Sequence, residues 1–137
     1  MYKVVRLIYG LGGINELVSA SVKKKARVVY SQGKVTYPPY FAIREQRGLL
    51  VFDTLINAAF FSAGETHFQI WECEITNPRE PKSRCATWEL ETLGWFKLAS
   101  ATPIPWPTGT VEVDTVKLIR QVQNDEITDE IRNLFPF

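Results

Sequence analysis

The sequence has few of the residues on which disulfide-stabilised and zinc-binding proteins depend. Its 137 residues include two cysteines, Cys73 and Cys85, and one histidine, His67. Two cysteines are too few for a disulfide framework, and their spacing, without a Cys/His cluster nearby, matches no zinc pattern. We therefore expect reduced thiols, no bound metal ion and a cytoplasmic protein.

Long apolar runs are missing as well. No stretch approaches the roughly 20 apolar residues of a membrane-spanning helix. The apolar run at the start of the sequence contains Lys3 and Arg6, and no small-residue cleavage site follows it, so it does not have the pattern of a signal peptide. These absences predict a protein without a membrane partner.

The motifs of nucleotide-dependent enzymes are also absent. The stretch GLGG, residues 10–13, lacks the G-x-G-x-x-G spacing, and no glycine-rich loop ends in Lys-Ser or Lys-Thr. A Ser-His-Asp or Cys-His arrangement could form only through His67, which has no recognisable nucleophile motif beside it. We expect no cofactor and a non-enzymatic function.

The composition that remains is that of a globular protein. Apolar residues make up 45% and aromatic residues 12% of the sequence, and the length suits one domain over residues 1–137. We expect an α+β fold, a single compact domain with a mixed or split β-sheet and two or three short helices. The predicted strands are Tyr2–Ile8, Ala26–Ser31, Leu49–Phe52 and His67–Ile75.

Two Asp-Thr pairs predict the starts of helices. In GLLVFDTLINAAFF, residues 48–61, Asp53 precedes a run with apolar residues at helical spacing, which Gly64 ends. The same order recurs around Asp114 in VEVDTVKLIRQV, residues 111–122. An aspartate directly before a helix accepts hydrogen bonds from the amides of the first turn. We expect Asp53 and Asp114 to be helix caps rather than catalytic carboxylates.

The last third of the sequence predicts an interface. Residues 85–98 suggest a helix ended by Gly94 and then a strand, and the Pro-Trp-Pro stretch after them must be extended. The acidic tail suggests a short helix with an apolar end. We expect self-association through this tip and the proline-held tryptophan, the alternative being a tail that docks on its own core. The interface residues are Trp106, Leu134, Phe135 and Phe137.

Charge is divided unevenly along the sequence. Residues 1–48 contain nine Lys and Arg against two acids, a net of +7, and residues 49–137 contain seven against thirteen, a net of −6. Such a division indicates a basic face for an anionic partner, or two halves that attract each other within one fold or between subunits.

The basic half contains the strongest binding pattern, in SVKKKARVVYSQGKVTYPPY, residues 21–40. Lys and Arg attract phosphates, and tyrosine rings stack on bases. The alternative is a solvated basic hairpin whose tyrosines pack at the margin of the core. The residues of this predicted ligand site are Lys23, Lys24, Lys25, Arg27, Tyr30, Lys34, Tyr37 and Tyr40.

A pair of acids, Glu72 and Glu74, alternates along the strand predicted at residues 67–75. Two carboxylates on one face could serve acid–base or metal chemistry. The alternative, which we favour, is that they form the solvated face of a sheet.

The segments YKVVR, YSQGKVTYPP, GLLVFDTLINAAFF and IWECEI, in this order over roughly residues 1–75, resemble short uncharacterised proteins of phages, viruses and microbes. Their order is also similar, more distantly, to compact split-sheet ADP-ribosyltransferase-like domains. Those domains typically carry an early Arg or His, a middle Ser or Tyr and a late Glu. The resemblance implies Arg6, Ser19 or Tyr30, and Glu112 in these places, and NAD as the substrate.

Three functions follow as hypotheses. We adopt the first, a small non-enzymatic binding protein for a nucleotide, a nucleic acid or another anionic, phosphate-bearing ligand. The second is an ADP-ribosyltransferase-like enzyme that uses NAD. The third is a protein–protein interaction or assembly module, which includes a homo-oligomer.

Overall fold

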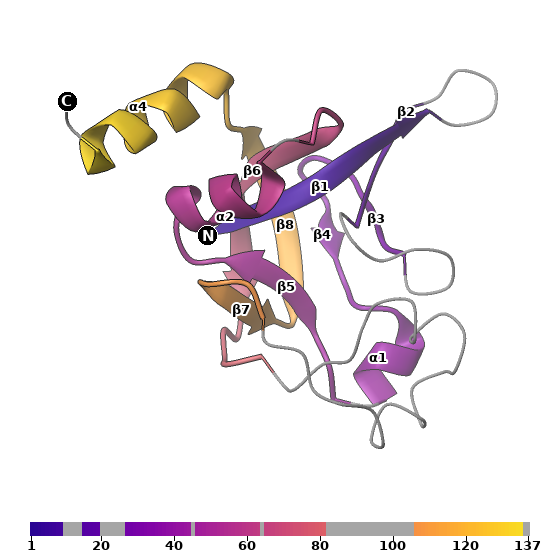
Figure 1. Ribbon diagram of the computed structural model, residues 1–137. Coiled ribbons are helices and arrows are strands. Elements are labelled where there is room, and N and C mark those ends of the chain that lie inside the picture. The colour runs from indigo at the N-terminus through magenta and orange to yellow at the C-terminus, as the bar shows by residue number, and fades with distance from the viewer. Residues whose placement is uncertain (10–14, 20–26, 45, 64, 82–105, 136–137) are drawn as a thin grey trace.

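The computed structural model describes residues 1–9, 15–19, 27–44, 46–63, 65–81 and 106–135 (Figure 1). The strands predicted at residues 2–8, 49–52 and 67–75 are confirmed, and the one predicted at residues 26–31 is shorter. The elements follow in the order β1 (Tyr2–Tyr9), β2 (Asn15–Ser19), β3 (Val29–Tyr30), β4 (Val35–Thr36), α1 (Tyr40–Arg44), β5 (Leu49–Phe52), α2 (Leu55–Ser62), β6 (Phe68–Thr76), β7 (Thr110–Val113), β8 (Thr115–Gln121) and α4 (Asn124–Leu134).

Some expectations concern residues outside these ranges. These expectations concern the three lysines Lys23–Lys25, the thiol of Cys85, the helix and strand predicted at residues 85–98, and Phe137. Within the described ranges, no helix has the length and apolar character needed to cross a membrane.

The strands form one curved sheet, in which all pairings between the described strands are antiparallel. The order is β3-β2-β1-β6-β8-β4, while β5 pairs with the start of β1 and with β7. A bulge interrupts the β6–β8 pairing between Glu72 and Cys73, and bulges of this kind increase the local twist of a sheet. The short helices and the sheet together confirm the expected α+β class.

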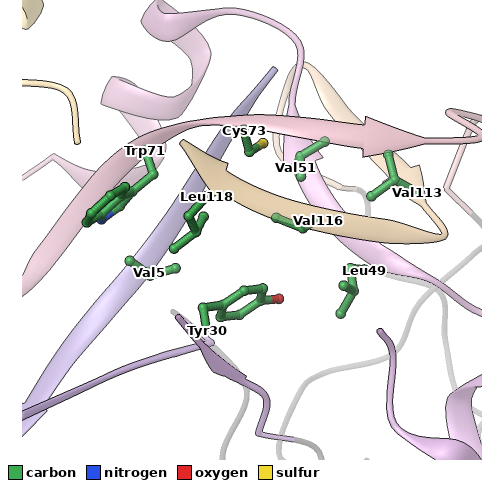
Figure 2. Packing of buried hydrophobic residues seen from close by; sticks show 9 residues of the cluster. All are labelled: Val5, Tyr30, Leu49, Val51, Trp71, Cys73, Val113, Val116 and Leu118. Atoms are coloured by element: carbon green, nitrogen blue, oxygen red, sulfur yellow. The ribbon is translucent and has the colours of Figure 1, made fainter. Parts of the chain in front are cut away.

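One face of the sheet encloses the larger core cluster. Its side chains come from β1, β3, β5, β6, β7 and β8, and strands so far apart in the sheet can share one cluster because the sheet curves around it (Figure 2). Burial of these β-branched and aromatic side chains is the main force that holds the strands together. The cluster consists of Val5, Tyr30, Leu49, Val51, Trp71, Cys73, Val113, Val116 and Leu118.

The opposite face is covered by α2. Val4 and Ile70 project from β1 and β6 toward the helix, whose Ala58 is fully buried against them. The ring centroid of Phe61 lies 5.1 Å from that of Phe52 and 6.2 Å from that of Phe68. Figure 1 shows α2 over the first half of β1, while the second half extends past the helix beside β2.

The helix predicted after Asp53 is confirmed, but its cap is Thr54. The Thr54 hydroxyl accepts a hydrogen bond from the backbone N–H of Asn57 at 3.2 Å. Asp53 lies one residue earlier, and its carboxylate accepts from the side-chain amide of Asn57 at 2.9 Å. Asp53 supports the first turn from outside, so its assignment as the cap was wrong by one residue.

Removal of the capping hydroxyl of Thr54 should therefore lower the stability of the protein. We expect Thr54→Ala to lower the free energy of unfolding by about 1 kcal/mol, because one amide of the first turn loses its acceptor. Chemical denaturation of Thr54→Ala beside Thr54→Ser measures the effect. A loss of the same size in Thr54→Ser would contradict the capping role, because serine keeps the hydroxyl.

The helix predicted after Asp114 does not form. Asp114 is the single residue between β7 and β8, and the residues after it continue as a strand. Thr115, Val116 and Ile119 are β-branched and favour a strand over a helix. The helix lies further on, where the Glu126 carboxylate accepts from the backbone N–H of Gln123 at 2.6 Å, as in a capping box. The short helix predicted in the acidic tail is thus confirmed.

Candidate functional site

The basic and aromatic residues of the predicted ligand site do not gather in one place. Tyr30 is 3% exposed and belongs to the larger core cluster, where Figure 2 shows its ring among the buried side chains. Burial also raises the pKa of its hydroxyl. Tyr30 therefore cannot stack on a ligand at the surface, and its inclusion in the site was wrong.

The other tyrosines of the predicted site are exposed. Lys34 lies in the turn before β4, Tyr37 follows that strand, and Tyr40 begins α1. Tyr37 is 63% and Tyr40 77% exposed. Arg27 lies in a different part of the structure, two residues before β3.

Arg27 shares a face of the sheet with Arg6. In the pairing of β1, β2 and β3, Arg6 lies opposite Val18, and Val18 lies opposite Val29, so these three side chains point to one side. The backbone carbonyl of Val28 accepts from the N–H of Ser19 at 3.0 Å, which continues the pairing. Arg27, two residues before Val29, therefore falls on the face of Arg6.

Both guanidinium groups contain buried donors without acceptors. The Nε and Nη2 atoms of Arg6 and the Nε atom of Arg27 are buried and have no hydrogen-bond partner. No ion pair links either group to a carboxylate of the described chain. Buried charged donors are costly to leave unsatisfied, and this pair of side chains, which we call the arginine face (Arg6, Arg27), therefore carries donors that are not yet paired.

A second group of charges surrounds Arg79, directly after β6. Its Nε atom lies 2.8 Å from Glu112 Oε2, and its Nη1 atom lies 2.7 Å from Asp114 Oδ1. The side-chain amide of Asn77 donates to the other oxygen of Asp114 at 3.0 Å. The amide of Asn77 and the guanidinium of Arg79 hold the pKa of Asp114 below its usual value. Asp114 is thus a member of an ion-pair cluster.

An open hollow of about 510 Å³ lies beside this cluster, lined in part by Tyr37, Ile43 and Gln46. Gly48 lies close by, and a Cβ atom there would collide with the backbone of Val113 and approach the Arg79 guanidinium. A glycine is therefore required for β5 and β7 to pair with Arg79 in this position.

Gln46 has a left-handed backbone with φ 57°. Its N–H donates to the carbonyl of Ile43 at 2.9 Å, and the N–H of Arg47 donates to that of Ala42 at 2.8 Å. These two bonds form the Schellman motif that ends α1, in which the left-handed position is usually glycine. A side chain at this position costs on the order of 1–2 kcal/mol.

The residues implied by the ADP-ribosyltransferase resemblance do not meet. Arg6 and Ser19 project from opposite faces, because Ser19 lies opposite Val5 and Arg6 opposite Val18. Ser19 Oγ accepts from the N–H of Val28 at 2.8 Å. Glu112 is 2% exposed and paired with Arg79. A catalytic group of these three residues is therefore not assembled.

The carboxylates of β6 take part in surface contacts. Glu72 Oε2 lies 3.1 Å from Arg120 Nε, and Arg120 also binds Glu126 at 2.8 Å. Glu74 is exposed. In the ranges that the structure describes, no group of three or more His, Cys, Asp or Glu side chains could hold a metal ion.

A buried lysine was missed by the sequence analysis. Lys3 is 7% exposed, its Nζ atom donates to the carbonyl of Leu50 at 2.6 Å, and it lies 5.0 Å from the centroid of the Tyr30 ring. Burial lowers the pKa of Lys3 to about 8 and raises that of the Cys73 thiol to about 11. The sequence signal for a buried lysine was a basic residue inside the apolar run of the first strand.

Comparison of the chain with protein-family models, curated proteins and solved structures finds no match. The candidate functions below are therefore argued from geometry and charge.

Proposed function

We propose that the protein binds a phosphate-bearing ligand, without catalysis, at the arginine face. The unsatisfied donors of Arg6 and Arg27 are the observation on which the proposal rests. Guanidinium groups present planar, paired donors that match the oxygens of a phosphate, and hydrogen bonds between charged groups are the strongest of their kind.

The sequence around the face adds to the argument. Lys23, Lys24 and Lys25 lie in the segment between β2 and β3, and residues 1–48 have a net charge of +7. Excess positive charge of this kind attracts polyanions over long range and accelerates their binding. A nucleotide or a nucleic acid provides both the polyanionic charge and the oxygens that the two arginines lack.

Loss of either arginine should weaken the binding of a polyanion. We expect Arg6→Gln and Arg27→Gln each to reduce the affinity for tripolyphosphate or a short oligonucleotide by about tenfold, since a hydrogen bond between charged groups is lost. Affinity of the unchanged protein should fall steeply with salt. Isothermal titration calorimetry at two or more salt concentrations measures both effects.

The matched control is Arg120→Gln, which removes a guanidinium that already has two carboxylate partners. It should leave the affinity nearly unchanged. Binding that ignores salt and survives both arginine-face substitutions would refute the proposed function.

A second candidate, self-association, has its own observation in α4. The helix has no buried residue, and Ile131, Leu134 and Phe135 are exposed on it. Its contact with the body runs through α2 and through Ile127, which packs against the buried residues under α2 that include Val4 and Ile70. We propose that this apolar end pairs with a second copy of the chain, because exposed apolar patches of this kind favour protein contacts.

Deletion of residues 133–137 tests this proposal. We expect a smaller particle by light scattering, with little change in the thermal stability of the monomer. A truncated protein of unchanged size that unfolds at a much lower temperature would instead indicate that the end docks on its own core. Trp106 is partly buried and has contacts of its own, so it is left out of the tested surface.

A further inference from the structure

The hollow beside Arg79 differs in charge from the arginine face. Two guanidinium groups, those of Arg47 and Arg79, lie at its wall together with the carboxylate of Asp114. Glu112 holds Arg79 from the buried side. The charges described at the wall and directly behind it, two positive and two negative, therefore balance, which favours an uncharged ligand over a free phosphate.

The hollow has the size and lining of a small-molecule site. Its volume of about 510 Å³ falls within the range of small-molecule sites, and Tyr37, Pro38 and Ile43 give it an aromatic and apolar wall. Tyr37 is 63% exposed, so its side chain is accessible to a ligand. Every nucleobase has a π-face that stacks on such a ring.

The side chain of Gln46 supplies hydrogen-bonding groups at the wall of the hollow. Its side chain lines the hollow from a left-handed position where glycine would be the less strained residue. A carboxamide presents one acceptor and two donors in a plane, the pattern that pairs with the edge of a nucleobase. Asp114, held in place by Asn77 and Arg79, offers acceptors for hydroxyl groups.

We propose that the hollow is a binding site for an uncharged nucleoside. The base stacks on Tyr37 and its edge bonds to the Gln46 amide, while the ribose hydroxyls donate to Asp114. The site is independent of the arginine face, because its described residues carry no excess positive charge and its ligand contains no phosphate.

Titration of the full chain with adenosine, guanosine, cytidine and uridine, each to millimolar concentration, tests the site by calorimetry. We expect at least one nucleoside to bind, and Tyr37→Ala to weaken it about tenfold or more. Gln46→Gly should weaken it by a similar factor and at the same time raise the thermal unfolding temperature, because glycine relieves the left-handed backbone. This variant therefore separates recognition from folding.

Tyr40→Ala is the matched control, since Tyr40 is an exposed tyrosine of the same segment that does not line the hollow. It should bind the nucleoside as the unchanged protein does. The double variant Arg6→Gln/Arg27→Gln should also retain nucleoside binding even if it loses tripolyphosphate. The proposal is overturned if none of the nucleosides binds, if Gln46→Gly binds unchanged, or if binding depends equally on Tyr40 or on the arginine face.

Discussion

Arg79→Met should lower the free energy of unfolding by about 3–5 kcal/mol, the cost of leaving a buried charge without its partner. Glu112 is 2% exposed, and its carboxylate accepts a hydrogen bond from the Arg79 Nε atom at 2.8 Å. The two residues also exchange backbone hydrogen bonds of 2.9 Å in each direction, so the pair connects the end of β6 to β7. Chemical denaturation near neutral pH measures the loss.

Two further variants test whether the burial of Glu112 causes this loss of stability. The double variant Arg79→Met/Glu112→Leu should recover most of the lost stability, because no charge remains buried. Arg120→Met removes an arginine that also bridges two carboxylates but at an exposed position, and it should have a small effect. Equal losses in Arg79→Met and Arg120→Met would contradict the view that burial of Glu112 sets the cost.

Lys3→Met should raise the free energy of unfolding by about 2 kcal/mol at pH 7. Burial lowers the pKa of Lys3 from 10.5 to about 8. At pH 7 the folded protein therefore bears the protonated amine at a cost of roughly 3 kcal/mol. Methionine removes this cost and loses about 1 kcal/mol from the hydrogen bond to the Leu50 carbonyl.

The advantage of the Lys3→Met variant should depend on pH in one direction. A lysine whose pKa is lowered by folding binds fewer protons in the folded than in the unfolded state between pH 8 and 10.5, so its presence becomes less costly as pH rises. The stability difference should thus be largest below pH 8 and shrink toward pH 10.5. Cys73 and Tyr30, whose pKa values are raised, titrate in both proteins and largely cancel in the difference.

Lys117→Met serves as the comparison, since Lys117 is a partly exposed lysine of β8 in the same sheet. It should change stability little and without this pH dependence. If Lys3→Met proves less stable than the unchanged protein at pH 7, the hydrogen bond and the contact with the Tyr30 ring outweigh the cost of burial.

Sequence periodicity was sufficient for the elements whose partners are local. β5 and α2 follow each other directly, and apolar spacing defined both within about one residue. The Asp114 junction was misassigned because Asp-Thr alone does not decide the structure. The two alanines, Ala58 and Ala59, in the run after Asp53 favour a helix, whereas the run after Asp114 has no alanine and contains the β-branched Val116 and Val122, which favour a strand.

The candidate sites could not be predicted from local sequence patterns alone, because they depend on tertiary structure. Arg27 and Tyr30 are three residues apart on extended backbone, which puts them on opposite faces, and this part could have been inferred from the alternation of strands. The proximity of Arg6 to Arg27 depends on two strand pairings, β1–β2 and β2–β3. The hollow is lined by residues of α1 and by residues that follow β4, α1, β6 and β7 in the sequence. Tertiary packing brings these segments together.

The position of β1 at the centre of the sheet has a consequence for the order of events during synthesis. β1 is synthesised before two of its neighbours, β5 (Leu49–Phe52) and β6 (Phe68–Thr76), and β4 is synthesised long before its partner β8 (Thr115–Gln121). Pairings between such distant segments slow folding, because a long loop must close before any contact compensates for it. The nascent chain therefore holds the apolar strand β1 with one edge open until β6, residues 68–76, has been synthesised. An open apolar edge of this kind favours association with other chains in that interval.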